Sequence, residues 1–158
     1  MKQTSLCYIE NNGRYLMLHR NKKKNDENSG NWIGVGGKFL EGESPEECMI
    51  REAYEETGIR VLKWHYRGIV TFVSDRWEGE HMHLFTAESE SADFHPCDEG
   101  DLQWIDKDEV TNLKIWEGDR IFLELLKDED LPFFSLKLSY CGDSLEKAVL
   151  NGQELEVI

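Results

Sequence analysis

The chain has 158 residues, 39% of them hydrophobic and 32% charged, which is typical of a globular domain with a substantial core. Its formal net charge of -14 disfavours binding to polymeric nucleic acid and to anionic membranes. No apolar run reaches the roughly 20 residues that a membrane-spanning helix needs. We therefore expect one cytoplasmic domain over residues 1–158, which binds neither membranes nor nucleic acid polymers. The sequence does not indicate its oligomeric state.

Two short β-prone runs near the N-terminus, residues 4–10 and 15–19, predict a β-hairpin because Asn-Asn-Gly separates them. The second run leads directly into RNKKK, one of the few basic clusters in this acidic chain. We assign Arg20 and Lys23 to phosphate binding, because anionic groups of a ligand need a local cation here. A solvated loop is the alternative.

Residues 32–38 read WIGVGGK, and three glycines in four positions let the backbone approach a ligand closely. We therefore expect Gly36 to contribute to a substrate site and Lys38 to place a cation beside it. A helix is predicted from Pro45 to Thr57, because Ser44 can cap its first turn and Gly58 suits the left-handed residue that ends a helix.

Three carboxylates of this predicted helix, Glu52, Glu55 and Glu56, fall within an arc of roughly 100°. Like charges this close destabilise a helix unless a cation lies among them. Mg²⁺ or Mn²⁺ suits the site, since both take carboxylate oxygens together with substrate phosphates. Arg51 can orient one of the carboxylates, and Glu43 can reach the same site from the preceding loop.

The rest of the chain predicts a mixed sheet with a second helix. We expect strands at residues 61–74, 81–88 and 102–105, a polar loop at 89–100, a helical turn at 106–112, an amphipathic helix at 117–127, and a closing hairpin of residues 133–140 and 145–150. The predicted fold class is therefore α/β, with one sheet between two helices.

The segment GKFLEGESPEECMIREAYEETGI, residues 37–59, fits Gly-x5-Glu-x7-Arg-Glu-U-x-Glu-Glu-x-Gly-U, in which U is apolar. It resembles the Nudix box and meets every defined position, which chance rarely achieves. A solvated acidic helix face is the alternative explanation for such a charge run. The resemblance implies the α/β/α sandwich of the Nudix fold, with the box as a loop–helix–loop. It also implies Mg²⁺-dependent hydrolysis of a nucleoside diphosphate linked to another group.

The resemblance also assigns roles to residues. It implies metal ligation by Glu52, Glu55, Glu56 and the carbonyl of Gly37, with Arg51 as an orienting partner. Glu99 matches the further glutamate that many members bring from a later loop as a ligand or base; an exposed loop acid is the alternative. The four glutamates and the arginine are the expected catalytic group.

A narrower resemblance extends over nearly the whole chain. The segments LMLHRNKK, NWIGVGGKFLEGES, HMHLF, QWIDKDEV and KIWEGDR are similar to MutT-type enzymes, which hydrolyse oxidised purine nucleoside triphosphates such as 8-oxo-dGTP to a monophosphate and pyrophosphate. The resemblance implies that Trp116 stacks on the purine, Asp119 reads its edge and Trp32 lines the same pocket. Core packing is the alternative for both tryptophans. The implied function is nucleotide-pool sanitation, which serves DNA repair.

Two positions depart from the animal branch of that group. There an asparagine follows the tryptophan matched to Trp32, and two aspartates precede the last helix; this chain has Ile33 and Gly118 at the differing positions. These departures leave the base specificity open. Two other functions remain: a Nudix pyrophosphatase for ordinary nucleotides, nucleoside diphosphate sugars or dinucleotides, and a non-catalytic nucleotide-binding regulator. The complete set of box glutamates argues against the regulator.

Overall fold

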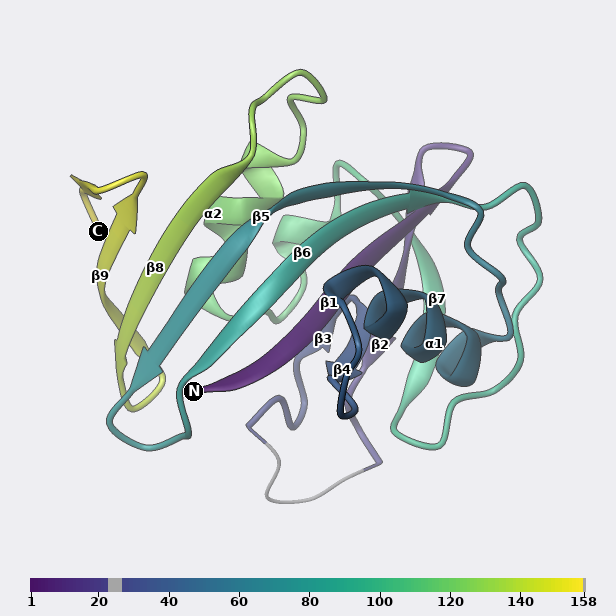
Figure 1. The fold of residues 1–158 in the computed structure, drawn as a ribbon, viewed down its shortest axis with the longest axis horizontal. Helices are drawn as coiled ribbons and strands as arrows, with labels where there is room; N and C mark the ends of the chain where they lie inside the picture. Colours follow the sequence, from purple (N-terminus) through teal and green to yellow (C-terminus); the bar gives the residue numbers. More distant parts are fainter. Residues whose placement is uncertain (23–26, 158) are drawn as a thin grey trace.

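The computed structural model describes residues 1–22 and 27–157, and strand β1 (Lys2–Asn11) lies at the centre of its sheet (Figure 1). β1 forms the predicted hairpin with β2 (Arg14–His19), across a turn in which Asn12 and Gly13 both have positive φ. Two such residues are typical of a tight hairpin turn. β1 also pairs in parallel with β6 (Glu80–Glu88), and antiparallel with β4 (Val35–Lys38).

The strands form one mixed sheet in the order β10-β9-β8-β5-β6-β1-β2-β3, with β4 on β1 and β7 on β2. The remaining strands are β3 (Trp32–Ile33), β5 (Lys63–Ser74), β7 (Asp101–Asp106), β8 (Phe134–Cys141), β9 (Ser144–Leu150) and β10 (Gln153–Leu155). The predicted strands are confirmed within one or two residues at each end. Strands β3, β4 and β10 were not predicted.

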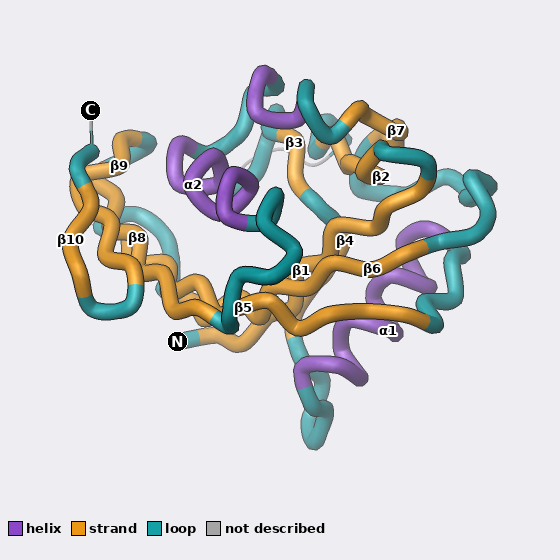
Figure 2. Tube along the Cα trace, turned by 90° about the horizontal axis from the view of Figure 1, so that it is seen from above, coloured by secondary structure: helices purple, strands orange, loops and turns teal. Residues whose placement is uncertain are grey.

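The two helices, α1 (Pro45–Thr57) and α2 (Glu117–Leu125), cover opposite faces of the sheet (Figure 2). Successive side chains of a strand point to opposite faces, and β1 follows this rule. Tyr8 belongs to the core beneath α2, whereas Cys7 and Ile9 belong to the core beneath α1. The α/β/α arrangement expected from the sequence is confirmed.

Helix α1 begins and ends where its capping residues predict. The Ser44 hydroxyl accepts a hydrogen bond from the Glu47 backbone N–H at 3.1 Å, and the Glu47 carboxylate accepts one from the Ser44 N–H at 3.0 Å. Gly58 has a φ of 77° and donates its N–H to the Tyr54 carbonyl at 2.8 Å. These local contacts fix the position of the carboxylates on the helix.

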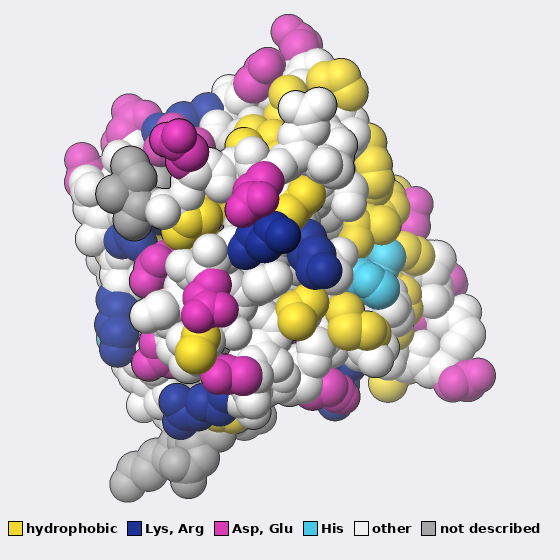
Figure 3. All heavy atoms as spheres, turned by 90° about the vertical axis from the view of Figure 1, so that its left-hand side faces the viewer, with side chains coloured by type: hydrophobic (Ala, Val, Ile, Leu, Met, Phe, Trp, Pro, Cys, Tyr) yellow, Lys and Arg dark blue, Asp and Glu magenta, His cyan; other side chains and the backbone are white. Residues whose placement is uncertain are grey.

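Helix α2 ends at Leu125, two residues before the predicted end, and a short 3-10 helix spans Val110–Asn112 inside the predicted helical turn. Among the described residues, no helix is long and apolar enough to cross a membrane. On the face shown in Figure 3, acidic side chains lie in scattered groups with basic side chains between them.

Candidate active site

The acidic face of α1 packs against the glycines of β4. A Cβ atom at Gly37 would lie 2.6 Å from the Glu52 Cδ, so any side chain at this position would displace the carboxylate. A Cβ atom at Gly36 would lie 1.8 Å from the Ser5 carbonyl oxygen, because β4 pairs closely with β1. The two glycines therefore let the carboxylates and the strand backbone come together.

Glu56 is the most buried carboxylate of this face, with 8% of its surface exposed. Its Oε1 accepts a hydrogen bond from the Gly36 N–H at 3.4 Å, while its buried Oε2 has no hydrogen-bond partner among the described residues. Burial, reinforced by Glu99 and Glu52, raises the Glu56 pKa to about 8. A buried carboxylate with an unused oxygen among other acids suits a cation.

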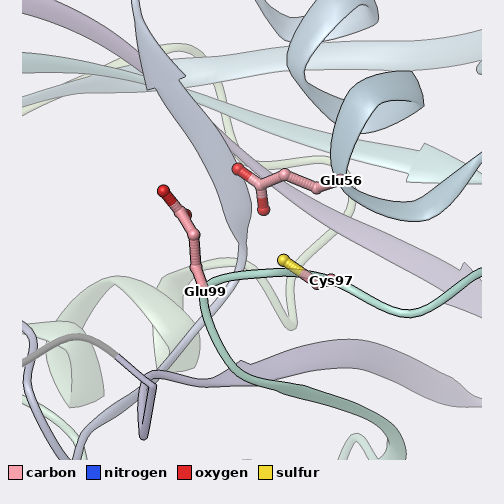
Figure 4. Close-up of side chains that lie close together, drawn as sticks. All are labelled: Glu56, Cys97 and Glu99. Carbon is pink, nitrogen blue, oxygen red and sulfur yellow. The ribbon is translucent and has the colours of Figure 1, made fainter.

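Two residues of the loop before β7 complete this acidic cluster. One ligand atom each from Glu56, Cys97 and Glu99 lies within 4.8 Å of the others, and the three side chains point toward one another (Figure 4). Arg20 Nη1 donates to Glu99 Oε2 at 2.8 Å, so the basic cluster after β2 reaches the same place. The structure therefore brings Glu99 and Arg20 together with the carboxylate face of α1.

Arg51 connects the other carboxylates of the motif. It donates to both oxygens of Glu43 at 2.7 and 2.9 Å, to Glu52 Oε1 at 2.7 Å and to Glu55 Oε2 at 3.2 Å. Glu43 first, and then Glu52, raise the Arg51 pKa and keep the guanidinium charged. Glu55 is exposed and lies outside the cluster of Glu56 and Glu99. Arg51 thus holds Glu52 in the arrangement that its predicted orienting role requires.

A cavity of about 390 Å³ adjoins the acidic cluster. Part of its polar lining comes from the glycine strand, α1 and neighbouring loops: Arg20, Gly36, Gly37, Lys38, Glu52 and Glu99. The other polar lining residues are Lys2, Thr4, Ser5, Glu27, Asn28, Glu80 and Asp119. Its apolar lining comes from the sheet and the start of α2: Leu6, Ile33, Phe72, Met82, Trp116, Leu138 and Tyr140. A cavity lined by both charged and aromatic side chains suits a ligand with an anionic part and a flat apolar part.

Trp116 and Asp119 lie in the apolar part of this cavity. The Trp116 Nε1–H donates to Asn28 Oδ1 at 2.8 Å, and its ring makes edge contacts with Phe72 and Tyr140 at 5.8 and 5.0 Å between centroids. Asp119 is 6% exposed, and burial, followed by the nearby charge of Glu80, raises its pKa to about 8. The aromatic ring of Trp116 and the buried carboxyl group of Asp119 therefore line the same part of the cavity.

A side chain at the residue before Asp119 would displace two neighbouring side chains. A Cβ atom at Gly118 would lie 2.5 Å from Leu138 Cδ1 and 2.6 Å from the Tyr140 hydroxyl, which accepts a hydrogen bond from the Gly118 N–H at 2.8 Å. A side chain at this position would therefore require Leu138 and Tyr140 to move.

A family model for the NUDIX domain matches residues 2–126. This chain belongs to the Nudix family. It is 30% identical over 139 residues to an oxidized purine nucleoside triphosphate hydrolase of Danio rerio, covering 86% of this chain and 87% of that protein. A Nudix hydrolase of Bacillus subtilis is 29% identical over 133 residues, covering 80% of this chain and 79% of the relative. The crystal structure of a MutT protein from Bacillus halodurans superposes with a TM-score of 0.83 at 26% identity, covering 96% of this chain and 98% of the other.

Nudix hydrolases generally use a divalent metal ion, and the donor set of this chain fits one. The unused Oε2 of Glu56 is an unsatisfied oxygen ligand, and Glu52 and Glu99 add hard carboxylate oxygens beside it. Cys97 was not singled out from the sequence, because an isolated cysteine carries no spacing signal. Its buried thiol has a raised pKa, mainly through burial, so it stays protonated and is a poor ligand for a hard cation.

Two residues predicted to bind substrate, Trp32 and Lys23, are not placed at the cavity by the described part of the structure. Trp32 is not among the described residues that line the cavity; it stacks on His19, with 4.5 Å between ring centroids and planes 6° apart. Ile33 lines the cavity instead, because neighbouring side chains of β3 point to opposite sides. Lys23 lies outside the described residues.

The structure also adds one cavity residue that the sequence analysis missed. Glu80, the first residue of β6, lines the cavity and is 8% exposed. A signal for it existed: Glu80 shares a strand face with Met82 and Leu84, so an acid stands at an otherwise apolar position.

Proposed function

We propose that this Nudix hydrolase cleaves oxidised purine nucleoside triphosphates, 8-oxo-dGTP above all, to a monophosphate and pyrophosphate with the help of Mg²⁺. The observation that carries the proposal is the single cavity that joins the acidic cluster to Trp116 and Asp119. The names of the zebrafish relative and of a mouse relative, 31% identical over 121 residues, point to the same substrate class.

The acidic cluster serves the diphosphate part of such a substrate. Glu52, Glu56, Glu99 and the Gly37 carbonyl would hold the cation, with Glu55 a further candidate. The bound cation would neutralise diphosphate oxygens and polarise the attacking water. Arg20 and Lys38 line the same part of the cavity and would bind phosphate oxygens. Glu56 and Glu99 are the nearby carboxylates able to take up a proton released by the water.

The apolar part of the cavity serves the base. The Trp116 ring provides a flat face on which a purine can stack, and Asp119 provides a buried acid that can bond to a polar edge of that purine. Buried polar groups discriminate strongly between bases, because a wrong base leaves them unpaired.

Steady-state product release with Mg²⁺ tests the proposal over a panel of 8-oxo-dGTP, dGTP, dCTP, ADP-ribose and a diadenosine polyphosphate. We expect kcat/KM to be highest for 8-oxo-dGTP, with pyrophosphate as its second product. Equal kcat/KM for 8-oxo-dGTP and dGTP would refute the preference for oxidised bases. Turnover of ADP-ribose or the dinucleotide alone would show a different substrate class for the same hydrolytic reaction. Absence of turnover with every compound would favour a non-catalytic nucleotide-binding protein.

The raised pKa values of Glu56 and Asp119 predict how stability depends on pH without metal. Both groups have a folded pKa of about 8, above that of an unfolded acid near 4, so the folded chain retains protons that the unfolded chain loses. Their contribution is fully present below about pH 4 and is lost as the pH rises toward 8. In EDTA, we expect Tm to fall between pH 5 and 9.

Two comparisons separate this effect from general charge repulsion in an acidic protein. An Asp119→Asn variant should show a shallower fall in Tm, since it lacks one of the two groups. Adding Mg²⁺ at pH 8 should raise Tm, because the cation favours ionised Glu56. Identical slopes for the wild type and the Asp119→Asn variant would contradict the assignment.

A further inference from the structure

The cavity holds a second buried acid in addition to Asp119. Glu80 is the first residue of β6, whereas Asp119 lies in α2, and both side chains line the same cavity. Thr4 Oγ1 donates to Glu80 Oε2 at 2.8 Å, which fixes the carboxyl group. The Glu80 Oε1 atom and the Asp119 carboxyl group take part in none of the hydrogen bonds found among the described residues.

Two buried acids that face one cavity destabilise the free protein, because burial penalises their charged forms and the Glu80 charge further raises the Asp119 pKa. Lys2 lowers the pKa of Glu80 and Arg120 that of Asp119, but burial outweighs both cations, and Lys2 is also paired with Glu27 at 3.0 Å. Polar groups held at such a cost and facing a cavity are suited to bind ligand atoms.

We propose that Glu80 is a second base-reading residue, which together with Asp119 binds the polar edge of a 6-oxopurine. The identity of the ligand as a nucleotide rests on the proposed function. A 6-oxopurine such as guanine presents the O6 acceptor beside the N1–H and N2–H donors. An ionised carboxylate can accept from the two adjacent N–H groups, while a protonated carboxyl group can donate to O6.

The chemistry of the two acids matches this edge. Burial raises the pKa of both groups, and the Asp119 pKa reaches about 8, so the pair retains a proton near neutral pH and offers one donor together with acceptors. A cytosine is too small to span from Trp116 to both acids in the same way. The pair therefore favours oxidised and ordinary guanine over cytosine.

The second acid comes from β6. A side chain at the position before Asp119 would require Leu138 and Tyr140 to shift. Glu80 supplies the carboxyl group from another element, held by Thr4. The hydrogen bond from Thr4 fixes the position of the Glu80 carboxyl group, which is buried and is not a solvated surface acid.

Binding of nucleoside monophosphates without metal isolates the base end of the cavity. Isothermal titration with 8-oxo-dGMP and dCMP would compare the wild type, Glu80→Gln and Thr4→Val, with Glu78→Gln as the matched control, since Glu78 is exposed and does not line the cavity. We expect Glu80→Gln to weaken 8-oxo-dGMP binding by about tenfold or more, Thr4→Val to weaken it less, and neither to change dCMP binding. Glu78→Gln should leave both affinities unchanged.

The outcomes distinguish this inference from the proposed function. Unchanged 8-oxo-dGMP binding in Glu80→Gln, or an equal loss for both monophosphates, would overturn the role of Glu80. If Glu80→Gln fails to fold, the Thr4→Val comparison decides in the same way. If the wild type hydrolyses no triphosphate but binds 8-oxo-dGMP in a Glu80-dependent manner, the proposed hydrolysis fails while the base-reading role stands.

Discussion

Replacement of Glu56 by glutamine should lower kcat by about 10²- to 10⁴-fold with any accepted nucleotide. Glu56 is the buried carboxylate of the acidic cluster, and its Oε2 has no partner among the described residues. Glutamine keeps the size of the side chain but removes the negative charge, so the variant loses both a cation ligand and a proton acceptor. Single-turnover and steady-state pyrophosphate release with Mg²⁺ measure the effect.

The variant should nevertheless be folded and at least as stable as the wild type without metal. A neutral amide removes the charge that burial penalises at Glu56. Glu46→Gln is a matched control on the same helix, because Glu46 lies outside both the cavity and the acidic cluster. Full activity in a folded Glu56→Gln protein would rule out the assigned role. Loss of activity in Glu46→Gln as well would show a general effect of charge on α1.

The limits of helix α1 could be predicted to the residue because they depend on local chemistry. Ser44, Glu47 and Gly58 make their capping contacts within a few residues of one another, and such contacts are written in the sequence. Strand β4 was missed for the opposite reason. Gly36 and Gly37 disfavour strands intrinsically, and only pairing with β1 makes them extended. In contrast, β10 follows Asn151-Gly152, a hairpin signal that the sequence did contain.

The candidate site divides in the same way. The Gly37–Ile59 segment carries its residue roles in linear spacing, so the sequence analysis placed Arg51, Glu52 and Glu56 in one region and the structure brings them together there. Glu80 enters the cavity through a distant strand pairing; its local signal, an acid at an otherwise apolar strand position, does not record the cavity that it faces. The resemblance to MutT-type enzymes assigned Trp32 to the cavity, but the alternation of β3 gives that place to Ile33.

Replacement of Trp116 by alanine should raise KM for 8-oxo-dGTP with a smaller effect on kcat. Stacking of a base on an aromatic ring contributes about 1–3 kcal/mol, so a loss of roughly 5- to 150-fold in kcat/KM is expected. Trp116→Phe should retain much of the activity, because a smaller ring still offers a flat face. Steady-state kinetics with 8-oxo-dGTP and dCTP, together with Tm, provide the measurement.

The comparison of variants separates stacking from core packing. Trp116 also contacts Asn28, Phe72 and Tyr140, so the alanine variant loses packing whether or not a base binds there. If packing alone mattered, Tm would fall while KM stayed near the wild-type value for the folded protein, and that result would contradict the stacking role. Trp64→Ala is the control, because Trp64 is 37% exposed and is not among the described residues that line the cavity. A rise in KM that is confined to Trp116→Ala and partly restored by Trp116→Phe would assign the ring to the base.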